Sequence, residues 1–136
     1  MTESSLTQVV QAHLRSRGFL VFKHADRFTV GIPDTTASKG GITWWLEFKL
    51  IKLKAWPIGL MMGDHLSPEE RGVQLATMVQ LQKAARAMYL LFIVTGDRWR
   101  LAPAAPDSVL LSVKNGWPIP CIEVSLDQLV VALEVR

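Results

Sequence analysis

The sequence predicts an α/β fold in which one helix, three strands, a second helix and a further strand follow each other in that order. Three observations predict it. Apolar residues near the N-terminus recur at helical spacing, residues 19–50 are rich in aromatic and β-branched side chains, and a strong helix start at Ser67 precedes a short apolar run. We therefore expect a mixed central sheet flanked by helices.

The first helix is predicted from the spacing of its apolar residues, and Gly18 is a suitable stop. Residues 19–24 and 27–32 then form two strands separated by a short polar break, as in a hairpin. We expect a turn through residues 35–41 and a third strand over residues 42–50. The apolar residues of the helix are Leu6, Val9, Val10 and Leu14.

The second helix begins with a serine cap at Ser67, a proline at Pro68 and a glutamate three residues after the cap, and we expect it to end near residue 87. It follows a long loop, residues 51–66. After the helix we expect a buried strand over residues 88–94, a strand over 99–102 that pairs back, and a proline-rich loop. A second capping box at Ser125 opens the last helix, to about residue 135.

The 136 residues and their 49% hydrophobic content suit a single domain, 1–136, with a core over about 1–101 and a C-terminal strand and helix appended over about 102–136. The lone Cys121 excludes a disulfide framework and a thiolate zinc cluster. No signal peptide is recognisable at the N-terminus, and every apolar run is shorter than a membrane span. We expect a soluble cytoplasmic protein with no membrane partner.

Positive charge is concentrated in one part of the sequence. Residues 15–54 contain eight basic and three acidic side chains, a net charge of +5, although the whole chain carries only +3. Such a segment is suited to a polyanionic partner. The alternative is that these lysines and arginines only solvate the surface.

One acid and one base share a face of the third strand. Side chains alternate along a strand, so Glu47 and Lys49 project together, about 7 Å apart. Asp34 follows Gly31-Ile32-Pro33, where we expect the second strand to end, and the turn after it brings a second carboxylate close to Lys49. Two carboxylates suit a hard cation, Mg²⁺ or Mn²⁺, which can activate water. A salt-bridged strand face is the simpler alternative.

These residues resemble a nuclease signature. Pro33-Asp34 followed by Glu47-Phe48-Lys49 resembles the PD-(D/E)XK motif, whose fold is the restriction-endonuclease-like α-β-β-β-α-β core. The longer phrases Gly31-Ile32-Pro33-Asp34 and Trp45-Leu46-Glu47-Phe48-Lys49, with a helix on either side, resemble the VRR-NUC branch. That branch includes phage-type stand-alone Holliday-junction-resolvase-like proteins, and the resemblance covers roughly residues 1–101.

The resemblance implies a role for each matching residue. Asp34 and Glu47 would be metal ligands, the Phe48 carbonyl a further ligand, Lys49 the catalytic lysine and Gln74 the glutamine of the second helix. Gln74 stands on the core-facing side of that helix. The glutamate of the first helix would be Glu3, whose position is equally explained by a favourable interaction with the helix N-terminus.

The resemblance also implies a metal-dependent endonuclease that cleaves branched DNA such as Holliday junctions, in a bacterial or phage-infected cell. Two symmetric cuts need two active sites, so we expect a homodimer. Basic residues of the positive segment are candidate contacts to the DNA backbone: Lys23, Arg27, Lys39, Lys52 and Lys54.

Two further interpretations remain open. A non-catalytic nucleic-acid-binding or assembly module could retain this fold, although the presence of Asp34, Glu47 and Lys49 together argues against it. A small-ligand enzyme has no support, because the sequence contains no glycine-rich phosphate loop. The loop over residues 51–66, with Trp56 and Met62, is either a flap that faces DNA or a partner, or a cover for the domain's own core.

Overall fold

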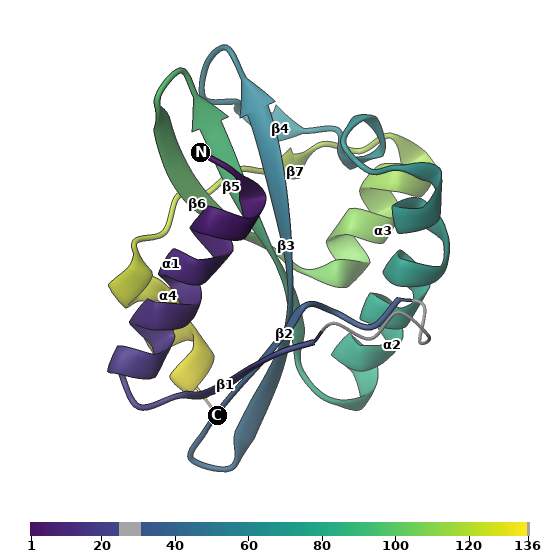
Figure 1. Ribbon diagram of the computed structural model, residues 1–136. Helices are drawn as coiled ribbons and strands as arrows, with labels where there is room; N and C mark the ends of the chain where they lie inside the picture. Colours follow the sequence, from purple (N-terminus) through teal and green to yellow (C-terminus); the bar gives the residue numbers. More distant parts are fainter. Residues whose placement is uncertain (25–30, 136) are drawn as a thin grey trace.

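A computed structural model of the chain describes residues 1–24 and 31–135, and its central feature is a five-stranded mixed sheet between two layers of helices. The helix and strand order agrees with the expected α-β-β-β-α-β core and continues beyond it (Figure 1). The elements are α1 (Glu3–Ser16), β1 (Leu20–Lys23), β2 (Thr35–Lys39), β3 (Ile42–Leu53), β4 (Gly59–Leu60), η1 (Met62–Asp64), η2 (Glu70–Gln74), α2 (Leu75–Ala84), β5 (Ala87–Thr95), β6 (Arg98–Ala104), α3 (Pro106–Asn115), β7 (Ile119–Pro120) and α4 (Leu126–Glu134).

The strands of the large sheet lie in the order β1-β2-β3-β5-β6, and β4 pairs with β7 in a small separate sheet. Neighbours in the large sheet are antiparallel except β3 and β5, which run parallel. A parallel pair requires a crossover, and the segment with η2 and α2 provides it. The crossover therefore places a helix over the face of β3 that carries the predicted site.

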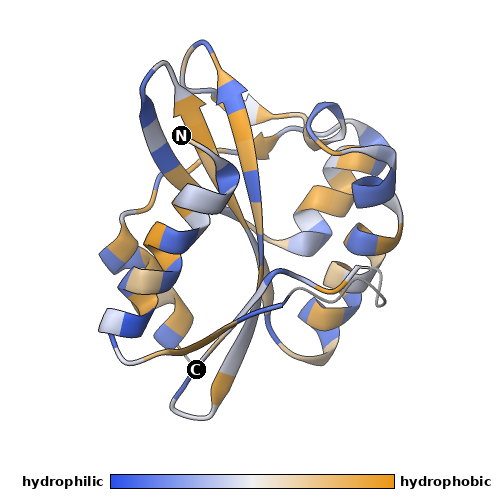
Figure 2. Cartoon of the chain, in the orientation of Figure 1, coloured by the Kyte–Doolittle hydropathy of each residue, from blue (hydrophilic) through white to orange (hydrophobic). Residues whose placement is uncertain are grey.

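Each face of the sheet has its own hydrophobic core. Helices α1 and α4, purple and yellow in Figure 1, cover one face, where Val10 and Leu129 pack with Phe48 and Phe92. Helices α2 and α3 cover the other face, where Met78 packs against the sheet. Figure 2 shows hydrophobic colouring on the central strand and on the helices of both layers. Both faces of β3 are thus covered.

The strand predicted over residues 27–32 falls mostly outside the described residues, and its last two residues, Gly31 and Ile32, belong to no strand. The second strand that the structure describes is β2. The stretch predicted as a turn therefore forms this strand, and only Gly40 and Gly41, both with positive φ, make the turn into β3. As a result Asp34 immediately precedes a strand instead of ending one.

Several other boundaries also differ from the prediction. β3 continues to Leu53, so the loop that follows is shorter, and it contains β4 and η1. The helix that begins at Pro68 ends at Ala84, because Ala87 already belongs to β5. The proline-rich loop contains α3, which has Pro106 in its first turn and ends at Gly116 in the left-handed region. The capping box at Ser125 is confirmed.

None of the described helices has both the length and the apolar character needed to cross a membrane.

Candidate metal-dependent active site

Asp34 and Glu47 lie opposite each other because the pairing of β2 and β3 is in register. Thr35, the first residue of β2, pairs with Leu46. The residue before Thr35, Asp34, therefore lies beside the residue after Leu46, Glu47. Their carboxyl groups are close enough to share a hydrogen bond when one of them is protonated. The backbone N–H of His24 donates to the Asp34 carbonyl at 2.6 Å, which extends the same row toward β1.

Burial and mutual repulsion make this carboxyl pair hold a proton. Glu47 is only 6% exposed. Burial, followed by the charge of Asp34, raises the pKa of Glu47 to about 9. Burial also raises the pKa of Asp34, against the opposing effects of Glu47, Lys23, the Phe48 N–H and His24. Both shifts therefore favour a proton on this carboxyl pair in the metal-free protein.

Along the edge of β3 next to Asp34, side chains take the place of a neighbouring strand as hydrogen-bond partners of the backbone. Beyond Leu46, β3 has no strand partner on this edge within the described part of the chain. The Phe48 N–H donates to the Asp34 carboxylate, and the Leu50 N–H donates to Glu3 Oε2 at 3.0 Å. The N–H and C=O of one strand residue point to the same edge, so the Phe48 carbonyl lies on the same edge as Asp34.

Gln74 reaches the site from the helical segment over the sheet. Its Nε2 donates to Glu47 Oε1 at 3.1 Å. Among the described residues, three buried polar atoms lack a hydrogen-bond partner: Glu47 Oε2, Gln74 Oε1 and the Tyr89 hydroxyl. Tyr89 is the partner of Glu47 in the β3–β5 pairing, and its pKa is raised by burial and then by the charges of Glu47 and Glu70. Unpaired buried oxygens beside a carboxyl pair suit a cation or an ordered water.

Lys49 does not pair with Glu47. Its Nζ lies 3.0 Å from Glu70 Oε1 and 3.1 Å from Glu70 Oε2. Glu70 also completes the capping box of the helix, because its Oε1 accepts the Ser67 N–H at 2.9 Å while Ser67 Oγ accepts the Glu70 N–H at 3.2 Å. Although burial alone would raise it, these Ser67 and Lys49 contacts lower the pKa of Glu70.

Glu70, Tyr89 and His24 also neighbour the site, and none of them was among the predicted site residues. His24 stacks on Trp45, with ring centroids 5.5 Å apart, and its Nε2 lies 3.0 Å from Thr36 Oγ1. Glu70 carried a signal as the capping glutamate, but its second partner, Lys49, is distant in sequence. Tyr89 carried none, because its place beside Glu47 depends on the β3–β5 register.

A small cavity of about 160 Å³ opens the site toward α1, and Asp34, Glu3 and Lys23 are among its lining residues. Gln11 also lines it, and its Nε2 donates to Thr35 Oγ1 at 2.9 Å. This cavity gives access to Asp34 from the α1 side of β3. On the side under η2, the Lys49 and Glu70 side chains are themselves partly exposed.

The residues present fit a hard divalent cation. Over residues 1–24 and 31–135 no three His, Cys, Asp or Glu side chains converge on one point, so a bound ion would have few protein ligands. Mg²⁺ and Mn²⁺ suit such a site, because one or two carboxylates, a carbonyl and several waters satisfy them. Asp34, Glu47 and the Phe48 carbonyl are the groups that would provide those ligands, and a cation would offset the burial that raises both pKa values.

The candidate DNA contacts do not form one patch. Lys23 is exposed beside Asp34, and Lys52 and Lys54 are exposed beyond Lys49 along the chain. Lys39 lies at the opposite end of β3, where its Nζ donates to the Arg17 carbonyl at 2.7 Å and pairs with Glu134 Oε1 at 3.3 Å. Arg27 lies outside the described residues.

The segment after β3 packs on its own domain. Leu60 and Met62 are buried in the core beneath α3, and the Met62 N–H donates to Ser112 Oγ at 3.0 Å. The Arg100 guanidinium lies 5.3 Å from the centre of the Trp56 ring. Met61 alone of the two methionines is exposed. This segment therefore covers the core through Leu60, Met62 and Leu66, whereas Ile58 is exposed.

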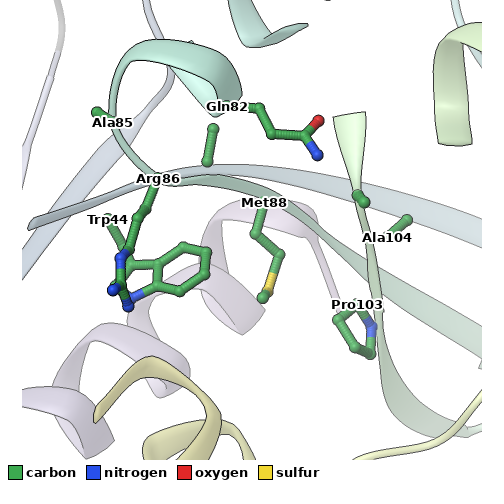
Figure 3. Close-up of a pocket in the computed structure, with 9 residues that line it drawn as sticks. Trp44, Gln82, Ala85, Arg86, Met88, Pro103 and Ala104 are labelled. Carbon is green, nitrogen blue, oxygen red and sulfur yellow. The ribbon is translucent and has the colours of Figure 1, made fainter. Parts of the chain in front are cut away.

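A larger cavity, of about 420 Å³, lies apart from these residues (Figure 3). Its polar side chains already have partners. The Arg86 guanidinium stacks 5.6 Å from the centre of the Trp44 ring and donates to the Val135 carbonyl, and Gln82 Oε1 accepts the Asp107 N–H at 2.8 Å. The cavity contains none of the predicted site residues, so the candidate site is the carboxyl pair at the edge of β3.

No protein-family model matches this sequence, and no curated protein matches it either. Among solved structures, the chain is similar to Hjc, a Holliday junction resolvase from the archaeal hyperthermophile Archaeoglobus fulgidus. The two share 23% sequence identity with a TM-score of 0.46, and the match covers 73% of this chain and 70% of that one. We therefore infer the chemistry of the site from its own residues.

Proposed function

We propose that this protein is a divalent-metal-dependent endonuclease that hydrolyses phosphodiester bonds in DNA. The observation that carries the proposal is the pair of adjacent carboxyl groups, Asp34 and Glu47, at an open strand edge with Lys49 two residues further on. A buried carboxyl pair that retains a proton costs stability, and a bound cation offsets that cost. Packing alone gives no reason for this arrangement.

Each residue has a role that follows from its position. Asp34, Glu47 and the Phe48 carbonyl would hold Mg²⁺ or Mn²⁺, which activates water and neutralises phosphate charge when bound. Gln74 fixes one oxygen of Glu47 through its 3.1 Å hydrogen bond. Lys49 supplies a positive charge for the attacked phosphate. Glu3 holds the Leu50 N–H at the edge of β3 and so supports the strand, without a direct place among the ligands.

The finer proposals depend on the sequence phrases that resemble the VRR-NUC branch of the PD-(D/E)XK nucleases. From them we propose a phage-type resolvase-like protein that acts as a homodimer on branched DNA in the cytoplasm of a bacterial or phage-infected cell. The exposed Lys23, Lys52 and Lys54 on either side of the carboxyl pair are the backbone contacts we propose.

The experiment that tests this proposal compares labelled linear, flapped and four-way DNA, each with Mg²⁺, Mn²⁺ or EDTA. We expect cleavage with either ion, none in EDTA, and a preference for four-way DNA. The double variant Asp34→Ala, Glu47→Ala serves as the matched control for a contaminating nuclease. Binding of DNA with no cleavage under any condition would favour a non-catalytic module instead.

A further inference from the structure

Two polar contacts connect the start of the second helix to the catalytic strand. Glu70 contacts Lys49, and Gln74 contacts Glu47. Both contacts come from η2, whose backbone leaves helical geometry at Gly72, between the two contacting residues. This one segment therefore holds both the acid and the base of the strand face, and it runs in the opposite chain direction to β3.

Glu70 holds Lys49 with both of its carboxylate oxygens. Both its oxygens accept from Lys49 Nζ, at 3.0 and 3.1 Å, while the Ser67 N–H holds Oε1 in place at 2.9 Å. The two side chains are 22% and 26% exposed, so water only partly screens the pair. Lysine is a flexible side chain with a compact charge, and its location depends on such a fixed partner.

We propose that Glu70 is the positioning residue of Lys49, an inference that rests on the proposed nuclease function. Without Glu70, the ammonium of Lys49 would lose the two carboxylate oxygens that hold it. Its flexible side chain would then be free to turn toward other carboxyl groups, and an ammonium bound at Asp34 or Glu47 would occupy oxygens that a cation needs. Glu70 thus holds the basic side chain of Lys49, two residues from Glu47, where it can contact a phosphate. Asp34 and Glu47 remain free to bind the metal.

A purely structural role for Glu70 makes different predictions. If Glu70 only caps the helix, then Ser67→Ala should impair the protein as much as Glu70→Ala, because each removes part of the capping box. Glu70→Gln should then be harmless, since glutamine also completes a capping box. If Glu70 positions Lys49, the charge and the Lys49 contact matter, and Ser67→Ala keeps both.

The first experiment measures kcat and KM for four-way DNA at saturating Mg²⁺. We expect Glu70→Ala to lower kcat by about 10- to 100-fold, as displacement of a reacting group by about 1 Å does, with KM unchanged. Glu70→Gln should retain more activity than Glu70→Ala, because its amide oxygen still accepts from Lys49. Ser67→Ala, and Glu69→Gln at the exposed neighbouring position, should stay within about twofold of wild type. Equal losses in Ser67→Ala and Glu70→Ala, or full activity in Glu70→Ala, would overturn the proposal.

The second experiment does not depend on turnover. Limited acetylation of the metal-free protein, followed by peptide mass spectrometry, compares Lys49 with the exposed Lys52 as an internal reference. We expect the Lys49 to Lys52 labelling ratio to rise several-fold in Glu70→Ala and to stay constant in Glu69→Gln. An unchanged ratio in Glu70→Ala would overturn the proposal. Absence of wild-type cleavage on every DNA would overturn the nuclease function itself, whereas wild-type cleavage with full Glu70→Ala activity overturns only the role of Glu70.

Discussion

Gln74 donates from Nε2 to Glu47 Oε1 at 3.1 Å, across the interface between the helical layer and β3. This bond fixes the orientation of a carboxyl group whose other oxygen, Oε2, is buried without a hydrogen-bond partner. Partners that orient a metal ligand in this way change metal affinity by about 10- to 100-fold when removed. The relationship can be tested because the next glutamine, Gln80, is exposed and offers a matched control.

We expect Gln74→Ala to weaken Mn²⁺ binding by about tenfold, measured by isothermal titration calorimetry. Gln80→Ala should bind Mn²⁺ as wild type does. Equal affinities for all three proteins would mean that the 3.1 Å contact does not orient a ligand.

Asp34→Ala and Glu47→Ala should each abolish cleavage of DNA while leaving DNA affinity equal or higher. In the proposed mechanism each change removes a cation ligand, and Asp34→Ala also removes a negative charge from the proposed phosphate-binding surface. Lys49→Ala should be inactive too, but should bind DNA more weakly. Filter-binding and cleavage assays on the same DNA separate the two effects, and full turnover by the double variant Asp34→Ala, Glu47→Ala would contradict the mechanism.

The metal-free protein should lose stability as pH rises from about 5 to about 9. The pKa of Glu47 is raised from an ordinary 4.5 to about 9, so in this interval the folded state keeps a proton that the unfolded state has released. The free energy of unfolding then falls with pH, by at most about 1.4 kcal/mol per pH unit from this group. Glu70, whose pKa is lowered, acts in the opposite direction and only at more acidic pH.

Urea denaturation in EDTA across this pH range measures that slope. Glu47→Gln cannot release the proton, so its stability should depend less on pH and should exceed that of wild type at pH 8. The exposed Glu69→Gln variant is the control and should keep the wild-type slope. A slope shared by wild type and Glu47→Gln would place the proton elsewhere.

Binding of a divalent cation should release a proton. Titration of Mn²⁺ in two buffers of different ionisation enthalpy should show this release, and affinity should increase from pH 6 to pH 8 by up to about tenfold per unit. In crystals with Mn²⁺, Asp34, Glu47 and the Phe48 carbonyl should lie about 2 to 2.6 Å from the ion. An ion bound without either carboxylate would contradict the assignment.

Replacing Lys52 and Lys54 together with alanine should lower the salt dependence of DNA binding by about one unit of slope for each phosphate that the variant no longer neutralises. Cleavage at saturating DNA should continue. Lys39→Ala is a useful comparison, because Lys39 is held by Arg17 and Glu134 at the far end of β3, and its removal should leave the slope unchanged. A slope that is unchanged in Lys52→Ala, Lys54→Ala would move the DNA path away from this end of the strand.

Local signals in the sequence were sufficient for part of this fold. The capping boxes at Ser67 and Ser125 mark two helix starts, and alternation along β3 places Glu47 and Lys49 on one face. These features depend on neighbours a few residues apart. The second strand and α3 were not predicted, each for its own reason. Thr35 gains its strand partner from Leu46, and Pro106, which suggested a loop, stands in the first turn of a helix.

The site shows the same division between local and distant information. Asp34, Glu47, Lys49 and Gln74 were predicted as a group from phrases that resemble a nuclease signature, and the structure brings Asp34 and Gln74 to Glu47. The Lys49–Glu70 pair, however, depends on where η2 packs over β3. Neither local sequence specifies this position, because it follows from the packing of the crossover on the sheet.

The parallel pairing of β3 with β5 has a consequence for how the protein acquires its site. Glu47 and Lys49 meet Gln74 and Glu70 only after the crossover has closed, and that step joins residues distant in the chain. Closing such a loop carries an entropy cost that slows folding, so the parallel pair should form late. Recovery of Mn²⁺ binding during refolding should therefore follow the slowest main phase of fluorescence recovery, and a chain arrested before that phase should have helices but no ion site.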